Sequence, residues 1–318
     1  MSSFNRRRFV ATGAATGAAL AAMGNTKAIF AQDGDKPEVT VGSHNYSEQF
    51  IIAEMAGLLL ENADFPVQYE HNLAGTVVLH EGLLSGDLDV YFEYLGGGLN
   101  ILGEEYADLV EDGTSAEDAQ GIVYEHVKER YLEEWNLHWL DPIGINNTYA
   151  IALRREDAEE MGVTKISELE PFADDLHIAG SQEFMIREDG LPGMEDAYGF
   201  SFGQSNGMES GLMYTALQNG DVDVISAFST DGRIPALDFV LLEDDLAFFP
   251  PYHASAVVRG ELLEEVPEAE EVLNQMGGLL DNTIMAELNF RVDDGGEEPR
   301  DVARDFLTQE GLLEGGDE

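Results

Sequence analysis

The chain of 318 residues contains no cysteine and only four lysines. Without cysteine it has neither a disulfide framework nor a thiol for lipid attachment. Acidic residues number 63 against 16 basic ones, giving a formal net charge of -47. Such a surface repels phosphate backbones, so we expect no nucleic-acid partner. Hydrophobic residues still make up 44% of the chain, which is too apolar for a disordered acidic tail and predicts a folded protein adapted to high salt.

Long apolar runs are also missing, including at the N-terminus. Residues 1–31 carry three consecutive arginines, then a short run of Ala, Gly and Thr, then the cleavage-like stretch AIFA. The run is shorter than the ~20 apolar residues of a membrane span. We interpret residues 1–31 as a twin-arginine-type export signal, which predicts an exported, extracytoplasmic protein. The sequence leaves open whether an uncleaved signal also holds the protein at a membrane.

The hydrophobic pattern from residue 38 onward alternates strands with helices. A strand at 38–43 precedes an amphipathic helix that Asn45 or Ser47 could cap. After a second strand, a short helix should run from about Thr76 to Gly86, where glycine can take the left-handed conformation of a helix end. A third strand follows directly. This alternation is typical of an α/β sheet with helices on both faces.

The same order of elements occurs twice. The stretch GDLDVYFEY, which ends at Tyr94, returns as GDVDVISAF, which ends at Phe228. We therefore predict an α/β fold of two lobes, each a mixed sheet flanked by helices, with a ligand cleft between them. The expected boundaries are 36–146 and 253–318 for a discontinuous lobe 1, and 147–252 for lobe 2.

Aromatic residues occur where the strand ends and the chain crossings should meet. Ligands of open α/β sheets bind beyond the carboxyl ends of the strands, so equivalent strand ends in two lobes should face one cleft. Each ring taken singly also fits an ordinary core position, but the duplication favours the cleft. Electron-rich ring faces bind a cation without hydrogen bonds, which suits a quaternary ammonium group because it has no N–H. The candidate rings are Tyr94, Tyr149, Phe228 and Tyr252.

One arginine lies in the acidic stretch EFMIREDG. The planar guanidinium of Arg187 fits a carboxylate, so the rings and this arginine together describe a zwitterion with a trimethylammonium head and a carboxylate tail. A salt bridge to a neighbouring acidic residue explains the arginine equally well. The alternative partners are Glu183, Glu188 and Asp189.

Six motifs occur in order along nearly the whole chain from about Val39 to Arg291. They are VGSHNYSEQFIIAEM, EYLGGGL, NNTYAIALR, EFMIREDGLPG, GLMYTALQNGDVDV and STDGRI. Together they resemble the glycine betaine/choline/carnitine substrate-binding proteins of ABC importers. The resemblance implies the type II periplasmic-binding-protein fold, an ammonium box at the four candidate rings and a carboxylate site at Arg187. It further implies a monomer that serves the permease and ATPase subunits of an importer of osmoprotectants.

Two positions depart from the family pattern. His44 replaces the family's lysine in GSK-x-F/Y-T-E-Q, while Gln49 retains its glutamine. The family's EYTGT or EYTGD reads EYLGGG here, so Gly97 stands where a side chain helps to separate carboxylate ligands from choline. We expect glycine betaine, with space at Gly97 for a larger ligand. Choline, carnitine or proline betaine as ligand, and a sensor role in place of transport, remain alternatives.

A serine hydrolase is the alternative from another class of protein. The stretch GQSNG places Ser205 in a G-x-S-x-G pattern, with His253 as the single histidine downstream. That pattern needs a buried strand before it and a helix after it, whereas Gly, Ser, Asn and Gln are typical of a loop. The seven histidines show no pair at metal-ligand spacing on one helix. We therefore expect no catalytic residue, no metal and no cofactor.

Overall fold

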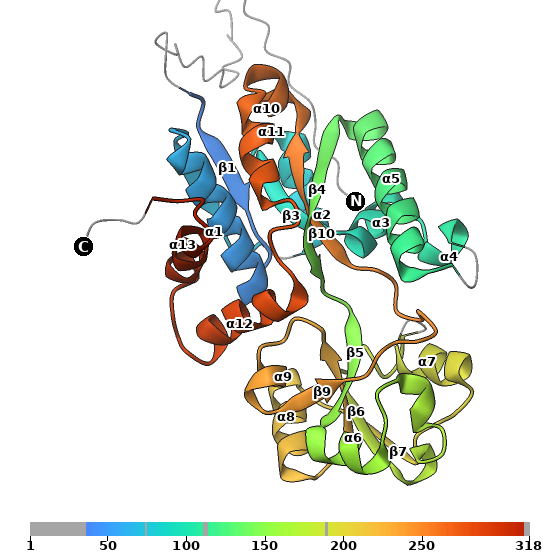
Figure 1. Cartoon of the computed structure of the whole chain (residues 1–318). Helices are drawn as coiled ribbons and strands as arrows, with labels where there is room; N and C mark the ends of the chain where they lie inside the picture. The colour runs from blue at the N-terminus through green and yellow to red at the C-terminus, as the bar shows by residue number, and fades with distance from the viewer. Residues whose placement is uncertain (1–35, 74, 111–113, 188–189, 315–318) are drawn as a thin grey trace, which may run out of the picture. The chain divides into compact units, whose positions relative to one another are not determined.

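The computed structural model describes residues 36–73, 75–110, 114–187 and 190–314 (Figure 1). The predicted export signal at 1–31 lies outside the described residues. None of the described helices combines the length and the hydrophobicity that a membrane span requires.

The first sheet has five strands in the order β2-β1-β3-β10-β4. β1 pairs parallel with β2 and β3, whereas β10 is antiparallel to both of its neighbours, β3 and β4. The strands are β1 (Val39–Gly42), β2 (Val67–Glu70), β3 (Val90–Tyr94), β4 (Leu137–Asn146) and β10 (His253–Arg259).

The second sheet repeats this plan in the order β7-β6-β8-β5-β9. β6 pairs parallel with β7 and β8, and β5 is antiparallel to β8 and β9. The strands are β5 (Tyr149–Arg154), β6 (His177–Gly180), β7 (Gln204–Gly207), β8 (Val224–Phe228) and β9 (Phe239–Leu241). Two mixed sheets with the same strand plan confirm the predicted fold class.

Helices cover both faces of the first sheet (Figure 1). One hydrophobic core lies between that sheet and α1, α11, α12 and α13, and another lies between its opposite face and α2, α3 and α5. The helices that flank this sheet are α1 (Ser47–Asn62), α2 (Thr76–Ser85), α3 (Leu95–Leu102), α4 (Tyr106–Leu109), α5 (Ala116–Trp135), α10 (Gly260–Glu265), α11 (Glu268–Leu273), α12 (Asn282–Asp293) and α13 (Pro299–Gln309).

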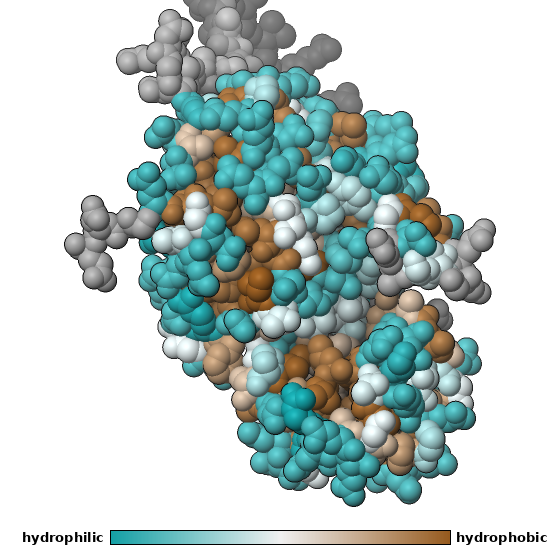
Figure 2. All heavy atoms as spheres, in the orientation of Figure 1, coloured by the Kyte–Doolittle hydropathy of each residue, from teal (hydrophilic) through white to brown (hydrophobic). Residues whose placement is uncertain are grey.

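Four helices accompany the second sheet, which also has a core on each face. They are α6 (Arg155–Met161), α7 (Leu191–Tyr198), α8 (Ser210–Asn219) and α9 (Arg233–Ala236). Short 3₁₀ turns complete the structure at Ile166–Leu169, Ala173–Asp175 and Asn274–Met276. Figure 2 shows hydrophilic side chains over most of one face of the molecule, with hydrophobic side chains gathered in patches.

The predicted end of α2 is confirmed, whereas the predicted cap of α1 is not. α2 begins at Thr76, and Gly86 ends it with a φ of 77°, as expected. The predicted cap of α1 is wrong, because the capping position is Tyr46 and no side chain caps the helix. The Ser47 hydroxyl, which could have capped α1, donates instead to the carboxylate of Asp293 in α12.

Gly144 in β4 provides a test of this packing. Its φ is +107°, and a Cβ atom there would lie 1.9 Å from the backbone oxygen of Leu280. We expect Gly144→Ala to lower the free energy of unfolding by about 2 kcal/mol or more, as measured by urea denaturation. Gly121→Ala in α5 is the matched control, since a Cβ there meets no atom within 4 Å. Equal stability of the two variants would show that β4 does not meet Leu280 as described.

Candidate ligand site

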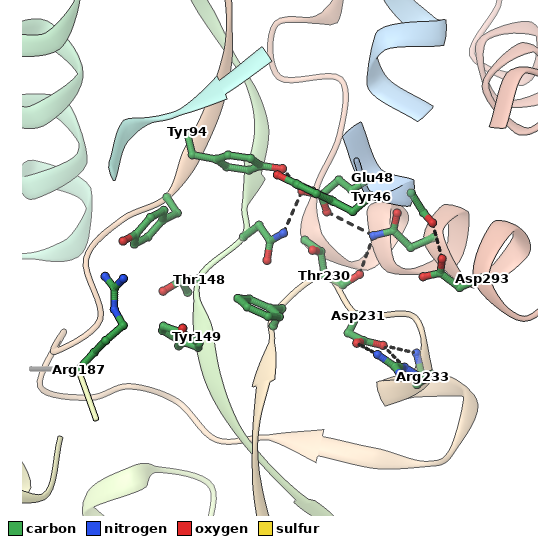
Figure 3. A pocket seen from close by; sticks show the side chains of 15 residues that line it. Tyr46, Glu48, Tyr94, Thr148, Tyr149, Arg187, Thr230, Asp231, Arg233 and Asp293 are labelled. Atoms are coloured by element: carbon green, nitrogen blue, oxygen red, sulfur yellow. Dashed lines mark hydrogen bonds and ion pairs between the residues drawn. The ribbon is translucent and has the colours of Figure 1, made fainter. Parts of the chain in front are cut away.

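A cavity of about 520 Å³ lies where the chain crosses between the sheets. Asn147 and Thr148 connect β4 to β5, and the return crossing runs from β9 to β10. Both crossings and the ends of β3 and β8 contribute to the cavity wall (Figure 3). Five aromatic rings line it: Tyr46, Tyr94, Tyr149, Phe228 and Tyr252. The structure therefore brings the four predicted rings together and adds a fifth.

Two of the rings come from neighbouring strands of the second sheet. Tyr149 and Phe228 are cross-strand partners in β5 and β8, and their rings stack with centroids 5.2 Å apart. The Tyr149 ring also packs on Phe184 and Phe249, at 5.1 and 6.2 Å between centroids. Those two residues belong to the core, so Tyr149 is fixed from behind, whereas Phe228 remains 44% exposed.

Two further rings lie together at the first sheet. Tyr94 ends β3, is only 7% exposed, and its hydroxyl donates to the carboxylate of Glu48. The hydroxyl of Tyr46 contacts that of Tyr94. Burial raises the pKa of Tyr94 well above its usual value, so its phenol stays neutral and remains a donor.

The Tyr252 ring lies against the start of α3. A Cβ atom at Gly96 would be 2.3 Å from Cε1 and 2.6 Å from Cζ of Tyr252. The backbone nitrogen of Tyr252 donates to the side-chain oxygen of Asn146 at 2.7 Å, which fixes the return crossing beside the first one. The absence of a side chain at Gly96 therefore makes room for the Tyr252 ring.

Three residues predicted for the site lie behind the cavity wall. His44 is buried, with Nε2 3.7 Å from Oε2 of the buried Glu93, and Gln49 is fully buried in α1. A Cβ atom at Gly97 would lie 2.3 Å from Oε1 of Glu93. The expected ligand space at Gly97 is thus absent, because the Glu93 carboxylate fills it.

Charged groups occupy different parts of the cavity wall. Figure 3 shows the Arg187 guanidinium and the Glu48 carboxylate on opposite sides of the ring cluster. Arg187 is exposed and lies in the turn after β6, where its backbone nitrogen donates to the oxygen of Glu183. Asp231 and Arg233 form an ion pair at 2.5 Å, and the Arg233 guanidinium also stacks on a buried tyrosine ring.

Several of the polar wall residues were not predicted from the sequence. Tyr46, Glu48 and Asn147 lie within the motifs GSHNYSEQF and INNTYA, so the same motifs could have identified them. Thr230 lies in the loop after β8, within the motif STDGRI, and Asn289 comes from α12. No sequence pattern pointed to Asn289.

The serine hydrolase alternative does not match the structure. The stretch around Ser205 forms β7, an exposed strand parallel to β6, so the expected loop is wrong and the strand-to-helix turn of a nucleophile elbow is not formed here. His253 begins β10 in the other sheet, and burial lowers its pKa to about 4. Within the described residues, acidic and histidine side chains form no group of three that could hold a metal ion.

The duplicated sheets, the double crossing and the ring-lined cavity define a two-lobed ligand-binding protein of the type II periplasmic class. A family model described as the substrate binding domain of an ABC-type glycine betaine transport system matches residues 37–309. The chain belongs to this family.

Relatives and solved structures agree with this assignment. The carnitine transport binding protein OpuCC of Listeria monocytogenes is 33% identical over 284 residues, covering 88% of this chain and 89% of its own. The ergothioneine transport permease/ergothioneine binding protein EgtU of Helicobacter pylori is 33% identical over 87% of this chain, which spans only 48% of EgtU. A crystal structure of a glycine betaine/carnitine/choline ABC transporter is 32% identical with a TM-score of 0.80, covering 87% of this chain and 99% of that one.

Proposed function

We propose that the protein binds a quaternary-ammonium zwitterion, glycine betaine foremost, and delivers it to an ABC permease with its ATPase. The observation that carries the proposal is the convergence of five aromatic rings on one cavity, three of them from strands of the two sheets. Each desolvated ring contributes roughly 0.5 to 2 kcal/mol to holding a cation, so several together give micromolar affinity after the cost of association. At molar salt the Debye length is ~3 Å, so these close contacts, not long-range steering, supply the binding energy.

The position of Arg187 supports a ligand that carries a carboxylate. Its guanidinium lies at the cavity wall beside Tyr149 (Figure 3). The names of relatives support the same class, since one is a glycine-betaine-binding protein of Pseudomonas aeruginosa and another transports carnitine. Choline lacks the carboxylate, and proline betaine differs in its ammonium substituents. The same cavity would therefore bind these two ligands with affinities that depend on those groups.

The chain acts as a binding protein and makes or breaks no bond. Lobe 1 consists of 36–146 and 253–318, and lobe 2 of 147–252. A ligand that touches rings of both lobes has greater affinity for the closed arrangement, so it drives closure, and the permease recognises the closed form. The protein works as a monomer outside the cytoplasm, exported through the segment at 1–31, without a cofactor.

The arginine gives the first test of the ligand class. Arg187→Ala should weaken glycine betaine by roughly 1.5 to 3 kcal/mol, the scale of a lost charge-assisted hydrogen bond, while sparing choline. Calorimetry in molar salt measures both affinities. Arg155→Ala, which removes an exposed arginine paired with Asp238, controls for the change in net charge. An equal loss for both ligands would remove Arg187 from the carboxylate site.

The rings give the second test. Tyr252→Ala or Tyr149→Ala should weaken every quaternary ammonium by about 0.5 to 2 kcal/mol, with or without a carboxylate, because the ring faces hold the shared cationic head. Tyr106→Ala removes a partly buried ring that does not line the cavity and should leave affinity unchanged. Unchanged affinity in a cavity variant would take that ring out of the site.

Gly96 gives a third test that leaves every ring in the sequence. Gly96→Ala should weaken quaternary-ammonium binding about tenfold, because the new Cβ displaces the Tyr252 ring. The double variant with Tyr252→Ala should bind no more weakly than Tyr252→Ala alone, since both changes remove the same contact. Gly121→Ala is the matched glycine control. Additive losses in the double variant would contradict the proposed role of Gly96.

A further inference from the structure

Glu48 is a buried carboxylate in the wall of the ligand cavity. It lies in the first turn of α1, is 3% exposed, and lines the same cavity as the aromatic rings. Oε1 accepts hydrogen bonds from the Tyr94 hydroxyl and from Nδ2 of Asn147 at 3.0 Å, and Oε2 accepts from Nδ2 of Asn289 at 3.3 Å. The side chain of Thr230 also hydrogen-bonds the carboxylate.

These four partners fit a negatively charged carboxylate. An ionised carboxylate only accepts hydrogen bonds, and the Tyr94 hydroxyl and the amide groups of Asn147 and Asn289 all donate to Glu48 here. Burial raises the pKa of Glu48, and the four hydrogen bonds oppose that rise. Among the described residues, these hydrogen bonds are the interactions that favour the ionised form, and no basic side chain adds to them.

No basic side chain in the described parts of the chain forms an ion pair with Glu48. Arg233, which lines the same cavity, pairs with Asp231 instead. A buried charge without a countercharge is costly, and a cation placed next to it offsets that cost. Tyr94, which donates to Glu48, is also one of the rings expected to hold the ligand's cationic head. A positive charge that offsets the Glu48 carboxylate would therefore lie inside the cavity.

We propose that Glu48 supplies the countercharge for the ligand's ammonium group and determines selection of ammonium ligands over ligands of the same shape without that positive charge. This inference rests on the proposed quaternary-ammonium function and adds a charge requirement that aromatic rings do not impose alone. With Arg187 across the cavity, the wall has a negative and a positive pole. A zwitterion would bind with its ammonium toward Glu48 and its carboxylate toward Arg187.

The test compares each quaternary-ammonium ligand with an isostere that lacks the positive charge. In tert-butylacetate and in the tert-butyl analogue of choline, carbon replaces the ammonium nitrogen of glycine betaine and of choline without changing the shape. Glu48→Gln should weaken glycine betaine and choline about tenfold or more, while the two tert-butyl ligands keep or gain affinity. Calorimetry gives the affinities of the cations, and competition at millimolar concentration gives those of the isosteres.

Thermal unfolding of the ligand-free protein gives a second measurement. Because burial raises the pKa of Glu48, the folded state holds the proton more tightly than the unfolded chain, and the ionised form lowers stability above that pKa. Glu48→Gln removes this cost, so the midpoint of unfolding at neutral pH should stay the same or rise. A group with a purely structural role would show a lower midpoint.

Glu54→Gln on the same helix is the matched control. Glu54 is paired with Arg300 at 2.7 Å and with His71 at 2.9 Å, outside the cavity. This variant should unfold at a lower temperature and keep the wild-type preference for cations over isosteres.

The outcomes separate this inference from the proposed function. Equal weakening of cations and isosteres by Glu48→Gln would overturn the countercharge role and leave the quaternary-ammonium function standing. A wild-type protein that binds neither glycine betaine nor choline would overturn both.

Discussion

The whole site depends on a two-residue connection between the sheets. Asn147 and Thr148 are all that separates β4 from β5, so the first residue of β5, Tyr149, must lie at the boundary. Hydrogen bonds tie this connection to the other segments that pass there. The backbone nitrogen of Asn147 donates to the oxygen of Tyr252, and the backbone nitrogen of Thr148 donates to the Ser229 hydroxyl. Rings from distant parts of the sequence are thus held within one hydrogen-bonded unit.

The duplicated motif explains why much of this arrangement could be predicted. The repeated stretch that follows a helix-ending glycine in each half identified the strands that end at Tyr94 and Phe228, and strand ends in such sheets point toward a shared ligand site. Tyr94, Tyr149 and Phe228 were predictable because they belong to strands, and Tyr252 because it lies in a crossing between the sheets. Asn289 was not, because its position follows from tertiary packing of α12 against the loop after β8, where its Nδ2 donates to the Thr230 backbone oxygen at 2.9 Å.

The glycine triplet after Tyr94 shows where residue-level expectations fail. Compared with the family pattern, position 97 lacks a side chain, which suggests empty space in the ligand cavity. The structure shows instead that each glycine admits a different neighbour: the Tyr252 ring at Gly96, the Glu93 carboxylate at Gly97 and the Trp139 ring at Gly98. Glu93 in turn lies near His44, the other departure from the family pattern. The two departures therefore meet at one buried carboxylate behind the cavity.

The position of β10 has a consequence for how the polypeptide assembles. This strand lies between β3 and β4 in the first sheet, yet it follows the entire second sheet in the sequence. During synthesis the second sheet can complete itself while the first still lacks its fourth strand in spatial order. Contacts of such long sequence separation form slowly. Folding of the first sheet therefore finishes only after the ribosome has delivered residues 253–259.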